Sequence, residues 1–154
     1  MPSLPNRLVA EALAAGGVPR LAGYARVRPE VRYGAASRVD FVLSAEGRAD
    51  AYVEVKNVHF QRRPGLAEFP DAATARGARH LRELAAVAAA GQRAALLYVV
   101  QRTDCTALRL AADRDPVYAA ASAAARALGV EVLAHAVRIG PAGIWLDREL
   151  PFEG

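Results

Sequence analysis

The stretch Ala51-Tyr52-Val53-Glu54-Val55-Lys56-Asn57-Val58 predicts a β-strand that carries charge on one face. The predicted strand covers residues 51–60, which are rich in valine and aromatic side chains, as is typical of strands. Because side chains alternate along a strand, Glu54 and Lys56 point the same way, while Val53 and Val55 point to the opposite face. The apolar neighbours predict a buried strand, where an idle charged pair would cost free energy. The pattern therefore indicates a functional site.

Lys56 is the only lysine in the chain, because nineteen of its 20 basic residues are arginine. Richness in alanine, arginine and glycine suggests a GC-rich coding sequence, in which lysine is replaced by arginine wherever charge alone matters. Lysine is a compact charge that can lose its proton, whereas arginine stays charged. A single retained lysine therefore indicates a task that a guanidinium group cannot perform.

A second strand is predicted over residues 38–43, and residues 45–50 around Gly47 predict the turn that joins it to the first stretch. A hairpin about Gly47 brings Asp40 and Glu54 side by side. Two carboxylates on one face repel each other unless a positive charge neutralises them. Mg²⁺ suits this role because it prefers oxygen ligands and commonly uses one or two carboxylates.

The Asp…Glu-x-Lys arrangement is the signature of a metal-dependent phosphodiesterase core. We expect Asp40 and Glu54 to hold one Mg²⁺ or Mn²⁺ ion, and Lys56 to orient or deprotonate the attacking water or to stabilise developing charge. The alternative is a surface hairpin with a Glu–Lys pair, because Glu-x-Lys alone is common.

The rest of the chain predicts one α/β domain over residues 1–154. Residues 6–15 predict a helix with Asn6 as its N-cap, which ends at Gly16-Gly17, and residues 25–33 predict an edge or bulged strand because of Pro29. The later elements are a basic loop at 61–70, a helix at 74–90, a buried central strand at 94–101, a short strand at 106–110, a helix at 115–128 and strands at 130–139 and 143–146. The order is helix, three strands, helix, strand, followed by extra carboxy-terminal α/β elements.

Composition restricts the class of protein. The 154 residues are 53% hydrophobic, which suffices for one domain with a core, but no apolar run approaches the roughly 18 residues that span a membrane. No secretory signal is evident, and Cys105 is the only cysteine, so no internal disulfide can form. We expect a cytoplasmic protein. A net charge of +4 fits a nucleic-acid partner.

Further polar residues are candidates for the same site. Glu11 lies in the first helix and Glu30 near the end of the first strand, and for each alone a solvated charge is the simpler explanation. Gln101 ends the most apolar strand and could reach a phosphate, or could bond backbone. Arg76, His80 and Glu83 share one stripe of the second long helix. The alternative for this stripe is a solvated face with an ion pair.

Five arginines surround the loop and helix that follow Lys56, and such a cluster suits a polyanion. They are Arg62, Arg63, Arg76, Arg79 and Arg82. With His80 and Gln101 they form the predicted nucleic-acid-binding set.

A series of motifs resembles the SfsA (sugar fermentation stimulation protein A) family over nearly the whole chain. They are Asn6-Arg7-Leu8-Val9 with Glu11-Ala12, residues 30–34, Ser37-Arg38-Val39-Asp40, residues 53–58, Phe69-Pro70-Asp71-Ala72, Arg76-Gly77 with residues 80–84, residues 115–118 and residues 129–132. The resemblance implies a restriction-endonuclease-like domain of the PD-(D/E)XK type that binds DNA, with a regulatory link to sugar catabolism. Asp40, Glu54 and Lys56 match that core, Glu11 matches a first-helix acid of such cores, and Glu30 matches a position of unassigned role.

The resemblance also implies an amino-terminal OB-like domain, and this chain begins almost at the Asn-Arg-Leu segment. A trimmed chain, a misplaced start codon or a natural short form would each explain this. The first hypothesis is a DNA-binding protein with a retained metal and phosphate site. The alternatives are an active Mg²⁺-dependent nuclease, with RNA also possible as a substrate, and a non-catalytic regulatory or protein-interaction module.

Overall fold

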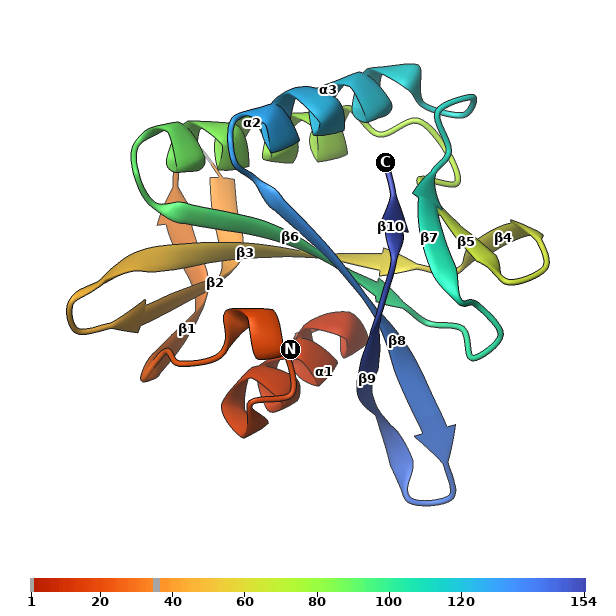
Figure 1. The fold of residues 1–154 in the computed structure, drawn as a ribbon, viewed down its shortest axis with the longest axis horizontal. Coiled ribbons are helices and arrows are strands. Elements are labelled where there is room, and N and C mark those ends of the chain that lie inside the picture. The colour runs from red at the N-terminus through yellow and green to blue at the C-terminus, as the bar shows by residue number, and fades with distance from the viewer. Residues whose placement is uncertain (1, 35–36) are drawn as a thin grey trace.

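A six-stranded mixed sheet forms the centre of the computed structural model, which describes residues 2–34 and 37–154 (Figure 1). In spatial order its strands are β1 (Arg26–Tyr33), β2 (Ser37–Ala45), β3 (Arg48–Val58), β6 (Arg93–Val100), β8 (Glu131–Gly140) and β9 (Gly143–Leu150). Strands β1, β2 and β3 form an antiparallel meander, β3, β6 and β8 run parallel, and β9 returns antiparallel to β8. The predicted α/β class is therefore confirmed.

The helices cover both faces of this sheet (Figure 1). Helix α1 (Leu4–Ala15) and the short 3₁₀ helix η1 (Pro19–Leu21) pack on one face, and α2 (Ala75–Ala89) and α3 (Pro116–Ala127) pack on the other. No helix of the described residues is long and apolar enough to cross a membrane.

Helix α1 begins earlier than the sequence predicts. Ser3 is its N-cap, so the assignment of Asn6 to that position is wrong, while the predicted end at Gly16 is confirmed. Ser3 is an equally good cap, and Pro5 fits the first turn because its missing N–H has no helical partner there. Asn6 therefore lies inside the first turn, and its side chain is free to reach the sheet.

A second sheet forms where a loop was predicted. Its strands, in spatial order, are β10 (Phe152–Glu153), β7 (Ala107–Leu110), β5 (Leu66–Phe69) and β4 (Phe60–Arg63). The prediction of a basic loop over residues 61–70 is wrong, because β4 and β5 make a hairpin whose turn contains Gly65 at φ 80°. Strand β5 then pairs in parallel with the distant β7, and this long-range pairing stabilises short strands that local sequence does not reveal.

The buried central strand is confirmed as β6, whose residues from Ala94 to Val100 are all fully buried. Its position between β3 and β8 covers both of its edges, and the helices cover both of its faces. Uniformly apolar strands are typical of parallel sheets buried on two sides. This core fixes the neighbouring β3, which carries the candidate site.

Candidate functional site

The hairpin about Gly47 places Asp40 opposite Glu54. The last pair in the β2–β3 ladder before them is Phe41 with Val53, and beyond it the strands separate. Past this pair, the Asp40 Oδ2 accepts a hydrogen bond of 2.7 Å from the backbone N–H of Val55. A side chain thus replaces the backbone partner and opens the sheet at the two carboxylates.

Asn6 holds Asp40 from the other side. Its Nδ2 donates to Asp40 Oδ1 at 2.8 Å, which links helix α1 to the sheet. Asn6 was predicted as the N-cap of this helix, and its contact with Asp40 was not predicted. The sequence contains one indication of this contact. Asparagine has a low helix propensity, so an asparagine in the first helical turn suggests that its side chain makes a specific hydrogen bond.

Glu54 is buried without adequate compensation. It is only 5% exposed, and its Oε2 is buried with no hydrogen-bond partner among the described residues. Burial, and next the neighbouring Asp40, raise the pKa of Glu54 to about 9. The site therefore disfavours two negative charges in the absence of a cation.

These features fit a divalent metal ion. Buried polar atoms without partners are rare in folded proteins, and a carboxylate oxygen is a ligand that Mg²⁺ prefers. No group of three or more metal-binding side chains occurs in residues 2–34 and 37–154. A site built on Asp40 and Glu54 alone leaves further coordination positions to water or to phosphate oxygens, as is common for Mg²⁺.

Lys56 lies beside the carboxylates and contacts His80 of helix α2. The Lys56 Nζ is 3.0 Å from His80 Nδ1. Burial lowers the pKa of Lys56, and burial together with the charges of Lys56 and Arg76 lowers the pKa of His80 to about 4. The imidazole is therefore neutral at pH 7, and its Nδ1 accepts a hydrogen bond from the Lys56 ammonium group.

His80 was assigned to nucleic-acid binding on a stripe whose simplest explanation was a solvated face. The structure instead buries His80, which is 5% exposed. Glu83, on the same stripe, accepts a hydrogen bond of 2.6 Å from Ser37 Oγ. Helical spacing identifies which residues share a stripe, but only the packing of α2 against the sheet shows that this stripe faces the site.

The start of α2 is fixed by two caps. Thr74 caps α2 by accepting a hydrogen bond from the backbone N–H of Gly77, and the Thr74 N–H donates to Asp115, which is the N-cap of α3. A Cβ atom on Gly77 would lie 3.0 Å from the ring of Tyr118, so glycine permits the close approach of the two helices. This arrangement positions Arg76 and His80 over β3.

A cavity of about 380 Å³ joins these side chains. Its lining residues are Pro2, Ser3, Asn6, Glu30, Asp40, Glu54, Val55, Lys56, Thr74, Arg76, Gly77 and His80. An adjoining cavity of about 410 Å³ contains Glu11 and shares Pro2, Asn6, Glu30 and Asp40 with the first. The structure thus brings Glu30, Asp40, Glu54, Lys56, Arg76 and His80 together and places Glu11 at the edge of the site.

Glu30 has an unusual backbone. Its φ is 51°, which a residue other than glycine rarely adopts. Such strain costs on the order of 1–3 kcal/mol and gathers at functional sites. The conformation lies beside Pro29 at the sheet edge, where the sequence predicts a bulge or an edge strand.

The other candidate residues do not line this cavity. Arg62 and Arg63 line a separate one, Arg79 forms an ion pair with Glu83 at 3.6 Å, and Arg82 is exposed on α2. The Gln101 backbone N–H donates to the Val58 carbonyl oxygen at 2.7 Å, and Gln101 is not among the residues that line the carboxylate cavity. Of the five clustered arginines, Arg76 alone lines the carboxylate cavity.

Comparison with known proteins places this arrangement in a family. The model of the sugar fermentation stimulation protein RE domain matches residues 3–143. The chain belongs to the sugar fermentation stimulation protein family. The predicted resemblance to SfsA is therefore confirmed.

Two relatives illustrate the similarity, and both are named sugar fermentation stimulation protein homolog. The protein from Roseobacter denitrificans is 58% identical over 149 residues, which cover 97% of this chain and 63% of the relative. The protein from Dinoroseobacter shibae is 56% identical over 151 residues, which cover 98% of this chain and 62% of the relative. The chain thus spans less than two thirds of the length of these relatives.

A solved structure of Pyrococcus furiosus SfsA in complex with Ca²⁺ has the same fold. The TM-score is 0.89 at 26% sequence identity, and the match covers 98% of this chain and 64% of that chain. The mixed α/β architecture described above is therefore that of an SfsA protein.

Proposed function

We propose that this chain is a DNA-binding domain with a PD-(D/E)XK-type site, in which Asp40 and Glu54 hold one Mg²⁺ or Mn²⁺ ion. The observation that carries the proposal is the buried carboxylate pair with the unpartnered Glu54 Oε2. The order α1, then β1 to β3, then α2 and β6 supports the assignment, because it is helix, three strands, helix, strand. The Ca²⁺ complex of the Pyrococcus furiosus relative supports a divalent cation.

The bound ion would supply positive charge that permits both carboxylates to ionise and that polarises a phosphate oxygen. The chain's own residues orient the substrate around it. Lys56 would direct its ammonium group toward a phosphate oxygen or the attacking water, while His80 Nδ1 holds Nζ in place. Arg76, exposed at the cavity, would contact the nucleic-acid backbone.

Cleavage of the phosphodiester bond is a second candidate function, with DNA or RNA as substrate. The Lys56–His80 contact favours it, because a pure binding surface gains little from a half-buried lysine of lowered pKa. A regulatory role in sugar catabolism without turnover remains a prediction from the family resemblance.

Metal binding tests the first proposal. In calorimetric titration with Mn²⁺, Asp40→Ala and Glu54→Ala should each weaken binding at least about tenfold, because each removes an ionic ligand. Glu46→Ala provides a matched control, since Glu46 is exposed at the hairpin turn. Unchanged Mn²⁺ affinity in both site variants would contradict the proposed metal site.

Nucleic-acid binding is tested by its salt dependence. The logarithm of the DNA association constant should fall linearly with log salt, by about 0.9 for each phosphate that the protein neutralises. Arg76→Ala should reduce the steepness by about 1, because its guanidinium group has no ion-pair partner in the described part of the chain. Arg26→Ala, an exposed change on β1, should leave the slope unaltered. A parent slope near zero would rule out nucleic acid as the partner.

A further inference from the structure

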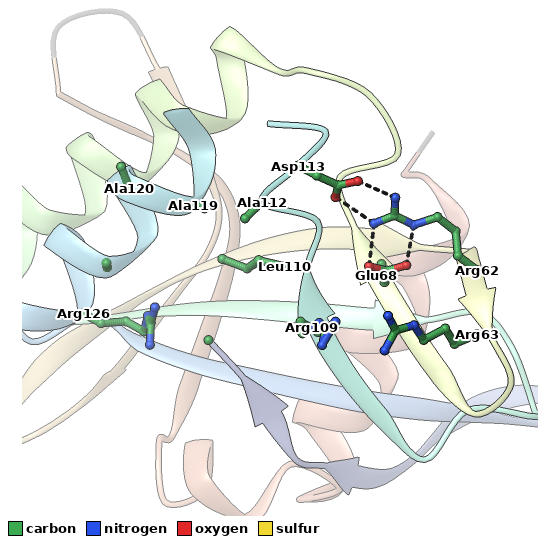
Figure 2. Close-up of a pocket in the computed structure, with 12 residues that line it drawn as sticks. Arg62, Arg63, Glu68, Arg109, Leu110, Ala112, Asp113, Ala119, Ala120 and Arg126 are labelled. Atoms are coloured by element: carbon green, nitrogen blue, oxygen red, sulfur yellow. Dashed lines mark hydrogen bonds and ion pairs between the residues drawn. The ribbon is translucent and has the colours of Figure 1, made fainter. Parts of the chain in front are cut away.

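A larger cavity lies away from the carboxylates, between the second sheet and helix α3. Its volume is about 880 Å³, more than twice that of the cavity around Asp40 and Glu54. The β4–β5 hairpin, β7 with the turn after it, α3 and Gly154 form its walls, and no residue that lines it also lines the carboxylate cavity (Figure 2). Volumes of this size are typical of small-molecule sites.

Arg62 in its wall is fully engaged. Its Nε and Nη2 bond Glu68 at 2.7 and 2.8 Å, and its Nη1 and Nη2 bond Asp113 at 2.6 and 2.8 Å (Figure 2). The guanidinium group of Arg62 holds the pKa values of both carboxyls below their usual range. Glu68 and Asp113 thus both pair with Arg62. They hold its guanidinium group in place and do not pair with the other arginines of the lining.

Three more arginines line the same cavity. Arg63, Arg109 and Arg126 form no ion pair with any residue between 2 and 34 or 37 and 154. Arg109 lies on β7 opposite Glu68 in the ladder register, Arg63 lies on β4, and Arg126 lies on α3 with a buried Nε that has no hydrogen-bond partner. Four arginine side chains and two carboxylate side chains line the cavity, so the side chains of the lining carry a net charge of +2.

The side of the cavity formed by α3 is apolar, because Ala119, Ala120 and Ala123 present only methyl groups. Leu110 of β7 adds an aliphatic side chain (Figure 2). The short alanine side chains leave room beside the guanidinium groups for an uncharged part of a ligand. Guanidinium forks match phosphate oxygens in two-pronged geometry, and apolar surface accepts a ring.

We propose that this cavity binds a phosphorylated small molecule of mononucleotide size. Arg63, Arg109 and Arg126 would receive the phosphate, and the alanine face of α3 would receive the ring. The cavity volume of about 880 Å³ lies in the range of small-molecule sites, which favours a compact ligand over a continuous polyanion. The proposal is independent of the metal site.

Calorimetry at low salt with AMP, adenosine and inorganic phosphate tests it. We expect AMP to bind at least about tenfold more tightly than either adenosine or phosphate, because it alone uses both the arginines and the alanine face. Arg63→Ala and Arg109→Ala should each weaken AMP binding about tenfold. Arg26→Ala, which removes an exposed arginine outside the cavity, should have no effect.

A shape variant tests the same cavity without removing charge. Ala120→Leu keeps a good helix former on the exposed face of α3 but fills the apolar side. It should weaken AMP binding about tenfold and leave phosphate binding unchanged.

Thermal melting of each variant identifies any loss of fold. Several outcomes would overturn the proposal: no AMP binding, AMP bound no more tightly than phosphate, or AMP binding that survives both arginine changes. Loss of AMP binding in Asp40→Ala would place the ligand in the carboxylate cavity instead. Displacement of AMP by duplex DNA, with DNA binding lost in the same arginine variants, would show a nucleic-acid surface.

Discussion

Replacing Lys56 by arginine should remove DNA cleavage while Mn²⁺ still binds. Lys56 Nζ fits beside the carboxylates at 3.0 Å from His80 Nδ1, and burial lowers its pKa. A guanidinium group is larger, planar and permanently charged, so it cannot occupy the same position or give up a proton. Loss of a positioned acid–base or electrostatic group costs about 100-fold or more in rate.

The measurement is single-turnover cleavage of labelled DNA and RNA with Mg²⁺ or Mn²⁺, alongside calorimetry with Mn²⁺. Arg82→Lys provides the reverse exchange at an exposed position of α2 and should retain full activity. Asp40→Ala should be inactive. Full activity in Lys56→Arg would show that only positive charge is needed, and unfolding of that variant would point to a structural role of Lys56 beside His80. No cleavage by the parent protein with either metal would withdraw the catalytic candidate.

The carboxylate pair could be predicted from sequence because local rules determine it. Alternation along β3 puts Glu54 and Lys56 on one face, and a turn at Gly47 fixes the hairpin register, so Asp40 must lie opposite Glu54. Only residues between 40 and 56 enter this argument. Short sequence separation is what made the core of the site predictable.

Contacts that join distant segments were not predictable in the same way. His80 reaches Lys56 across 24 positions, and Asn6 reaches Asp40 across 34. Helical periodicity placed His80 on a stripe, but it does not say which edge of α2 overhangs the sheet. Tertiary packing decides which edge of α2 lies over the sheet. Because of this packing His80, which was expected at the surface, is buried and contacts Lys56.

The second sheet shows the same limit. Strands β4 and β5 have four residues each, and an arginine-rich run around Pro64-Gly65 has the composition of a loop. The partner of β5 is β7, which lies about 40 positions away, and Arg62 finds Asp113 across 51 positions. Counting arginines near Lys56 therefore predicted one basic surface where the structure has two separate cavities.

Replacing Glu54 by glutamine should stabilise the metal-free protein, and by more as the pH rises. The pKa of Glu54 is raised from its ordinary 4.5 to about 9, so the folded state retains a proton that the unfolded state releases. Below the unfolded pKa both states are protonated, so the ionisation of Glu54 does not change the free energy of unfolding. Above it, stability is lost by up to about 1.4 kcal/mol per pH unit until the folded pKa is reached.

Glutamine mimics the protonated carboxyl group and removes this loss. Urea unfolding with a chelator present should show a small difference at pH 5 and a gain of about 2–4 kcal/mol for Glu54→Gln near pH 7.5. Glu46→Gln, at the exposed turn, should match the parent at every pH. Equal stability of parent and Glu54→Gln across this range would show that the carboxylate is ionised without cost.

Added Mn²⁺ should reverse the order. A ligand that binds only the folded state stabilises it by RT ln(1 + [L]/Kd). The free energy of unfolding of the parent should therefore rise with Mn²⁺. That of Glu54→Gln should not, because this variant has lost the Glu54 carboxylate ligand. A buried acid that costs stability without metal and contributes it with metal is maintained for binding rather than for folding. Glu54→Gln could instead remain more stable than the parent by the same amount at saturating Mn²⁺. That result would show that the burial of Glu54 is unrelated to metal binding, and it would remove the main support for the site.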